Sequence, residues 1–194
     1  MLYLTLHWIV RFLFSVFFRY RVIGAENIPK TGPAIICPNH ISNLDPPLIG
    51  VSTKRKVHFM AKEELFRIPI FRSLIRYLNA FPVNRSGGGR EAIQKGMELL
   101  KEDKILGIFP EGTRSKTGKL GKGRVGAAVL ACRAGVPLIP TAIIGGYRLF
   151  RPLYVVFGKP IHPYEYEGKS SNPVRDLTDR LMKEIQRLLD SNLS

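Results

Sequence analysis

From residue 28 onward, short apolar runs bounded by proline or glycine alternate with segments whose apolar residues recur at helical spacing. The short runs predict strands at 34–37, 57–60, 80–83, 104–109, 137–144 and 153–158. The helical spacing predicts helices at 46–52, 69–78, 90–101, 123–134 and 173–189. Strands that alternate with helices indicate an α/β fold. We therefore expect a single layered domain with a mixed, largely parallel sheet flanked by helices.

The chain begins with its only long apolar run of low charge, at residues 1–18. His7, Arg11 and Ser15 recur every fourth residue, which predicts a helix with one narrow polar stripe. Such a helix is about 27 Å long, slightly short of a bilayer core. A transmembrane span would place Arg11 near the middle of the bilayer, where a charge is costly.

This composition favours a helix that lies in a membrane interface over one that crosses it. We expect residues 1–21 to form an amphipathic membrane-associated helix, and residues 22–194 to form the folded domain. Trp8, Tyr3 and the phenylalanines would contact lipid, and the arginines would lie at the headgroups. A helix that packs into a soluble core, and a true transmembrane span, are the alternatives that the pattern leaves open.

The charge balance narrows the kind of partner. Thirty Lys and Arg residues against fifteen Asp and Glu residues give a net charge of +15, which indicates an anionic partner such as nucleic acid, anionic lipid or a phosphorylated substrate. A hydrophobic fraction of 45% excludes a disordered chain. Cys37 and Cys132 are too few for a disulfide framework and are expected to be reduced, and no Cys/His spacing indicates a structural metal.

The densest group of reactive side chains follows the predicted strand 34–37 and includes His40 and Asp45. Ligands of α/β sheets bind beyond the carboxyl ends of strands, so a site is expected there. A neutral histidine can accept a proton from an attacking hydroxyl when a carboxylate fixes its tautomer. On one helix these residues would be about 140° apart, so they meet only if a loop joins them. Asp45 as a simple helix N-cap, and Ser42 as a nucleophile, are alternatives.

A second group follows the predicted strand 104–109, in the segment 109–115. A turn there would place Glu111 and Arg114 together. Gly112 and Arg114 suit an anion site, because an arginine fork binds phosphate and glycine lets backbone N–H groups approach an anion. The basic residues in and after this segment support an anion site: Arg114, Lys116, Lys119, Lys122 and Arg124. A tight turn with a local Glu–Arg pair is the alternative. A third candidate, Arg85, follows the strand 80–83 and is unremarkable alone.

Taken in order, these segments resemble the 1-acylglycerol-3-phosphate acyltransferases of the glycerolipid acyltransferase family. The resemblance covers about residues 22–160 and rests on Gly24-Ala-Glu-Asn-Ile-Pro29, Asn39-His40-x-Ser42-x-x-Asp45, Phe81-Pro-Val-Asn-Arg85, Phe109-Pro-Glu-Gly-Thr-Arg-Ser115 and Val136-Pro-Leu-Ile-Pro140. The second of these contains the His-x4-Asp pair, and the fourth matches over all seven positions. Asn79 departs from the family, where glycine is common near this position.

The resemblance implies an enzyme that transfers an acyl group from acyl-coenzyme A or acyl carrier protein to 1-acylglycerol 3-phosphate, making phosphatidic acid. His40 would be the general base and Asp45 its partner. The residues implied to bind the glycerol phosphate are Arg85, Glu111, Gly112, Thr113 and Arg114. Glu111 would orient an arginine or a glycerol hydroxyl, since a carboxylate repels phosphate.

The same resemblance implies supporting roles for three further residues. Asn39 or a backbone N–H would stabilise the oxyanion, Ser42 completes the first motif, and Pro140 shapes a pocket. The segment 69–78 is a candidate wall for the acyl chain. No metal or cofactor is expected, and the protein is expected at the cytoplasmic face of the cell membrane, on an anionic lipid surface.

Two other functions compete with this interpretation. A related acyltransferase would use another acceptor, such as glycerol 3-phosphate, another lysophospholipid or a lipoamino acid. A non-catalytic domain that binds nucleic acid or an anionic membrane would explain the net charge alone. The sequence lacks helix-turn-helix, zinc-finger and aromatic RNA-binding signatures, so no nucleic-acid partner is expected.

Overall fold

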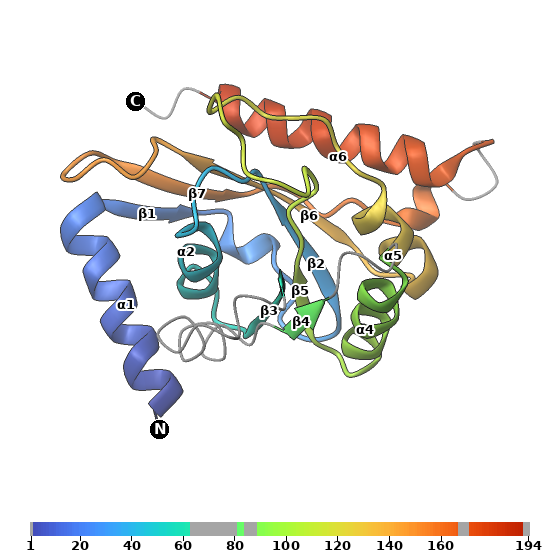
Figure 1. Cartoon of the computed structure of the whole chain (residues 1–194), viewed down its shortest axis with the longest axis horizontal. Coiled ribbons are helices and arrows are strands. Elements are labelled where there is room, and N and C mark those ends of the chain that lie inside the picture. The colour runs from blue at the N-terminus through green and yellow to red at the C-terminus, as the bar shows by residue number, and fades with distance from the viewer. Residues whose placement is uncertain (1, 63–80, 84–88, 167–170, 192–194) are drawn as a thin grey trace.

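The computed structural model describes residues 2–62, 81–83, 89–166 and 171–191. The helices are α1 (Leu2–Phe18), α2 (Asp45–Val51), α4 (Arg90–Lys101), α5 (Gly126–Ala134) and α6 (Pro173–Asp190), with short 3-10 turns at Ala25–Asn27 and Pro163–Glu165. The strands are β1 (Tyr20–Ile23), β2 (Ala34–Pro38), β3 (Val57–Lys62), β4 (Phe81–Val83), β5 (Ile105–Gly107), β6 (Leu138–Ile144) and β7 (Leu153–Phe157). Figure 1 shows these elements around one twisted sheet.

The sheet has seven strands in the order β1-β7-β6-β2-β5-β3-β4. All neighbouring strands run parallel except β6 and β7, which form an antiparallel pair. The expected mixed, largely parallel sheet is therefore confirmed. Strand β2 lies between β6 and β5, so the loops that follow β2 and β5 leave the same edge of the sheet side by side.

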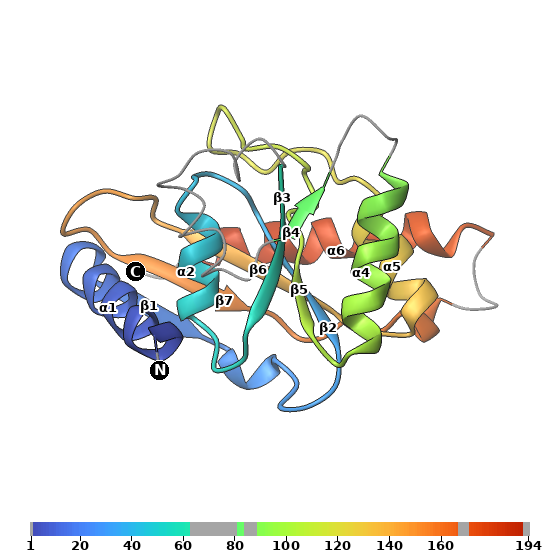
Figure 2. The ribbon, with the colours of Figure 1, turned by 60° about the horizontal axis from the view of Figure 1, so that its bottom comes forward.

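Two helical layers cover the sheet, and the alternation along β2 shows why. Ala34 and Ile36 belong to the core that includes residues of α1 and α2, whereas Ile35 and Cys37 face α4, α5 and α6. All four side chains are fully buried, which explains why β2 is a continuous apolar run rather than an alternating one. Figures 1 and 2 show α1 and α2 on one face, and α4, α5 and α6 on the other.

Most predicted elements are present, and the differences have local causes. Strand β1 was not predicted, because its exposed and half-buried residues alternate over only four positions at the edge of the sheet. As a result, the predicted boundary after residue 21 falls inside β1. Helix α5 begins three residues later than predicted, because Arg124 donates its backbone N–H to the Pro110 carbonyl and stays outside the helix. The predicted helix 69–78 lies outside the described residues.

Helix α1 packs on α2 through one side, and its mid-helix arginine takes part in that contact. Phe14 is buried, and the Arg11 guanidinium donates to the Val51 carbonyl at the end of α2 over 3.1 Å. This arginine therefore satisfies a carbonyl that the helix end leaves without a partner, instead of lying at lipid headgroups as expected. None of the helices in the described residues is long and apolar enough to cross a membrane.

The other side of α1 leaves its apolar side chains in solvent. We call this set the exposed α1 face: Trp8, Ile9, Phe12, Leu13, Val16 and Phe17. Its members include Phe12, which is 66% exposed although it is a large aromatic residue. The helix is thus neither a fully packed core helix nor a polar surface helix, and an exposed apolar surface of this kind is typical of an interaction site.

Candidate functional site at the carboxyl end of the central strands

His40 and Asp45 meet at the carboxyl end of β2. The chain leaves the strand after Pro38, forms a loop, and enters α2 at Asp45. Because a loop separates the two residues, their side chains converge, and His40 Nδ1 lies 2.7 Å from Asp45 Oδ2. Asp45 does not act as an N-cap, a position that Leu44 occupies without a side-chain bond. Its carboxylate turns back toward the loop instead.

The Asp45 carboxylate is fully buried and collects four hydrogen bonds. Oδ2 lies 2.7 Å from His40 Nδ1 and accepts from the backbone N–H groups of Ile41 and Ser42, at 2.7 and 2.8 Å respectively. Oδ1 accepts from the Tyr147 hydroxyl at 2.6 Å. A buried charge is tolerated only when it is satisfied in this way. Burial and then the negative charge of Asp45 raise the pKa of Tyr147 far above its ordinary value, so the phenol remains a donor.

The His40 ring contacts its carboxylate partner through a ring nitrogen and an aromatic neighbour through one face. It stacks on Phe109 with 3.9 Å between ring centroids and 19° between planes, and its side chain is 17% exposed. Phe109 in turn stacks on Phe59 from β3. When Nδ1–H donates to Asp45, the lone pair lies on Nε2, the nitrogen that a substrate would meet. The arrangement therefore suits a general base.

Glu111 braces the site through the backbone, and no arginine among the described residues forms an ion pair with it. Glu111 is buried, with Oε1 accepting from the His40 backbone N–H and Oε2 from that of Gly121, both at 2.8 Å. From the end of the same segment, the Ser115 N–H donates a hydrogen bond to the His40 carbonyl at 2.8 Å. The segment 109–115 is thus tied to both backbone groups of His40.

The segment 109–115 reaches the surface at Thr113 and Arg114. Gly112 has a φ of 69° and donates its N–H to the Phe109 carbonyl, so this N–H closes the turn rather than reaching for an anion. A Cβ at Gly112 would lie 2.8 Å from Arg124, which packs over it. Thr113 and Arg114 are exposed beside the turn. Arg85 lies outside the described residues.

The three supporting residues contribute structure around the dyad. Asn39 is buried and hydrogen-bonds the backbone of β6. Its side-chain amide donates to the Ile143 carbonyl and accepts from the Ile143 N–H. These two bonds use Oδ1 and one of the two N–H donors of the Asn39 amide. Ser42 Oγ accepts from the Leu44 N–H, and no hydrogen bond between described atoms joins it to the His40 ring. Pro140 is buried in β6, where its carbonyl accepts from the Gly158 N–H.

Sequence reasoning missed Tyr147 and the stacking role of Phe109. Tyr147 follows β6 by three residues and lies 102 positions from Asp45, so only the folded chain brings them together. An aromatic residue directly after a glycine pair at a strand end is the only signal it gives. Among the described residues, no three His, Cys, Asp or Glu side chains gather in a way that would hold a metal ion.

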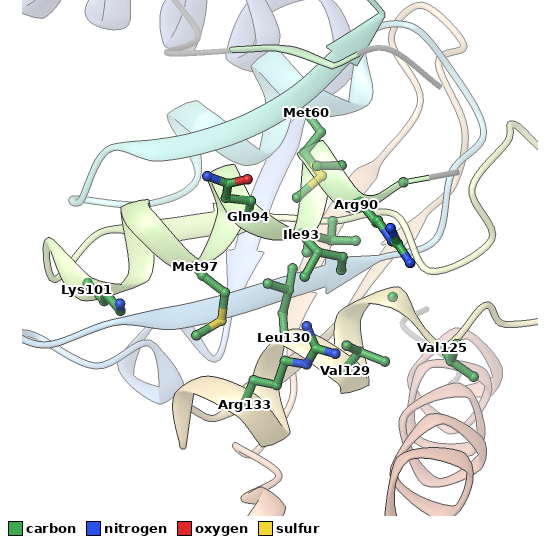
Figure 3. Close-up of a pocket in the computed structure, with 14 residues that line it drawn as sticks. Met60, Arg90, Ile93, Gln94, Met97, Lys101, Val125, Val129, Leu130 and Arg133 are labelled. Carbon is green, nitrogen blue, oxygen red and sulfur yellow. The ribbon is translucent and has the colours of Figure 1, made fainter. Parts of the chain in front are cut away.

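A separate cavity of about 740 Å³ lies on the α4 and α5 side of the sheet. Met60, Ile93 and Leu130 line its apolar floor, and Arg90 and Arg133 stand at its margin (Figure 3). These apolar residues belong to the core opposite the one that contacts Phe109, so the sheet separates this cavity from the His40 ring. The wall predicted at 69–78 lies outside the described residues.

Replacing Glu111 with glutamine should destabilise the fold. A glutamine has one acceptor oxygen, so either the His40 or the Gly121 N–H would lose its partner. We expect Glu111→Gln to lower the free energy of unfolding by about 1–3 kcal/mol, measured by chemical denaturation. Glu98→Gln is the matched control, because Glu98 is exposed and pairs only with Lys95 on the surface. Equal midpoints for the two variants would contradict the bracing role.

Several known proteins are similar to this chain over most of its length. A 1-acyl-sn-glycerol-3-phosphate acyltransferase of Bacillus subtilis is 32% identical over 88% of this chain and 89% of its own length. The enzyme of the same name from Borreliella burgdorferi is 30% identical over 86% of this chain and 72% of its own length. The crystal structure of the acyltransferase PlsC from Thermotoga maritima has a TM-score of 0.78 and 28% identity, over 99% of this chain and 81% of that one.

The family model described as Acyltransferase matches residues 19–144, which contain β1 to β6 and therefore both His40 and Asp45. The match covers more than half of the chain and agrees with the similarity to the bacterial enzymes. The chain belongs to the acyltransferase family.

Proposed function

We propose that this chain transfers a fatty acyl group from an acyl thioester to the free hydroxyl of 1-acyl-glycerol 3-phosphate, making phosphatidic acid. The observation that carries the proposal is the His40–Asp45 dyad, with its 2.7 Å contact at the carboxyl end of β2. The names of the relatives from Bacillus subtilis and Borreliella burgdorferi supply the acceptor.

In the proposed reaction, His40 Nε2 removes the proton from the acceptor hydroxyl as its oxygen attacks the thioester carbonyl. Asp45 steadies the imidazolium that forms. The tetrahedral intermediate then collapses, its carbon–sulfur bond breaks, and the leaving thiolate takes the proton from His40. The products are the new ester and a free thiol, so neither a covalent acyl-enzyme nor a cofactor is required.

The phosphate of the acceptor would bind beside the segment 109–115. Arg114 is exposed there, and it forms no ion pair with another described residue. The basic side chains that follow it in the same loop are also exposed: Lys116, Lys119, Lys122 and Arg124. No aspartate or glutamate lies between Glu111 and Glu165, so this surface attracts anions. We infer that Arg114, with Arg85 and Thr113, holds the acceptor phosphate.

The thioester donor is either acyl-coenzyme A or acyl carrier protein. Both are anionic, so the same basic loop suits either one. Both donors are therefore offered in the assay of acyl transfer.

His40→Ala should abolish acyl transfer without unfolding the protein. Loss of a general base lowers kcat by about 10²- to 10⁴-fold. The measurement is phosphatidate formation from lysophosphatidate with each donor, and His162→Ala is the matched control because His162 lies outside the site. Wild-type rates in the His40 variant would contradict the mechanism. A folded wild-type protein that is inert with both donors would show that the acceptor is wrong.

We also infer that the exposed α1 face lies in the interfacial layer of the membrane that holds the lipid substrate. Apolar side chains on one side of a helix bind an interface in proportion to the apolar area buried, and basic residues near it bind anionic headgroups. Arg19 and Arg21 are exposed directly after α1. This would place the protein as a peripheral or monotopic enzyme at the cytoplasmic side of the cell membrane.

Trp8 reports on this placement, because it is the single tryptophan and is 64% exposed. With vesicles of phosphatidylcholine and phosphatidylglycerol, we expect its emission to shift to shorter wavelength and to be quenched by lipids brominated near the headgroup end of their chains. Unchanged emission in the presence of excess vesicles would contradict the interfacial placement of α1.

A further inference from the structure

The hairpin that joins β6 to β7, residues 145–152, exposes two large apolar side chains at its tip. Arg151 donates its backbone N–H to the Arg148 carbonyl, which makes Leu149 and Phe150 the central residues of a turn. They are 61% and 62% exposed. Phe150 has a φ of 60°, in the left-handed region that favours glycine or asparagine. The turn thus carries bulky apolar residues where neither solvent exposure nor backbone geometry favours them.

This tip adjoins the exposed α1 face. The Phe150 N–H donates to the Phe17 carbonyl at the end of α1 over 2.7 Å, although more than 130 positions separate the two residues. Figures 1 and 2 both show the hairpin loop beside the C-terminal end of α1. The exposed side chains at 149 and 150 therefore extend the apolar surface of α1 with residues from a second, distant segment.

The charges around this surface identify its partner. Arg148 and Arg151 flank the tip and are exposed, as are Arg19 and Arg21 after α1. Neither the first 25 residues nor the hairpin contains an aspartate or glutamate. Association with a second copy through this surface would bring arginines against arginines. An anionic bilayer instead offers lipid chains to the apolar side chains and phosphates to the arginines.

We propose that the β6–β7 hairpin is a second membrane-contact element, in which Leu149 and Phe150 enter an anionic phospholipid bilayer and Arg148 and Arg151 bind its headgroups. This inference rests on the proposed placement of α1 in the interface. It adds a contact that the amphipathic pattern of residues 1–18 does not contain. Two contacts from separate segments fix the tilt of the domain on the bilayer, which one helix alone leaves free to roll.

The same hairpin contributes Tyr147, which relates the membrane contact to the dyad. Tyr147 bonds Asp45 with its hydroxyl, and its ring packs edge-on against Phe18 of α1 with centroids 5.8 Å apart. Only one residue, Arg148, separates Tyr147 from the tip. The proposed contact therefore holds the His40–Asp45 dyad close to the membrane surface in which the lipid acceptor resides.

A tryptophan moved to the tip tests the proposal directly. In the double variant Trp8→Phe/Phe150→Trp, the only tryptophan lies on the hairpin, and Trp8→Phe/Tyr164→Trp places it on an exposed aromatic position beside α5 as the matched control. With vesicles of phosphatidylcholine and phosphatidylglycerol containing brominated lipid, we expect quenching at position 150 and none at position 164. Circular dichroism checks that both variants remain folded.

Each outcome separates the hairpin from α1. Quenching of Trp8 in the wild-type protein without quenching at position 150 would overturn the hairpin proposal and leave the placement of α1 intact. If neither Trp8 nor a tryptophan at position 150 is quenched, the hairpin proposal and the placement of α1 are both overturned. As a second measurement, Leu149→Ser/Phe150→Ser should lower the vesicle partition coefficient about tenfold, because it removes two inserted apolar side chains. An unchanged coefficient would also overturn the hairpin proposal.

Discussion

The buried carboxylate of Asp45 is the interaction on which the rest of the site depends. A charge without solvent must be matched by donors, and here they come from three places: the His40 ring, the backbone of the loop after β2, and Tyr147 of the β6–β7 hairpin. Each donor is fixed as the carboxylate is satisfied. The loop conformation, the ring orientation and the position of Tyr147 thus meet one electrostatic requirement.

The order of the strands brings these donors together. Because β2 lies between β5 and β6, the segments that leave the carboxyl ends of these three strands are neighbours. Glu111 after β5 braces the backbone of His40, and Asn39 clasps Ile143 on β6. Buried side chains that bond the backbone thus join all three segments, while the exposed arginine of the basic loop remains available for an anionic substrate.

The sequence predicted the features that depend on local pattern. Short apolar runs predicted six of the strands, and Asn39-His40 after one of them predicted where chemistry would lie. The four-residue edge strand β1 was not predicted, because its pairing with β7 depends on residues more than 130 positions away. The roles of Tyr147 and Glu111 were not predicted either, because they too depend on residues that are distant in the sequence. A tyrosine or glutamate acquires its partner only in the fold, and Glu111 beside Arg114 in the sequence suggested an ion pair where the structure has backbone bonds.

The most direct test of this account is the tautomer of His40, read from its ring ¹⁵N chemical shifts. His40→Ala assigns the signals, because the chain has only four histidines. The account predicts that neutral His40 carries its proton on Nδ1, and that Asp45→Asn, which removes the carboxylate, shifts the population toward the Nε2–H form. A wild-type ring protonated on Nε2, or a tautomer ratio that Asp45→Asn leaves unchanged, would contradict it.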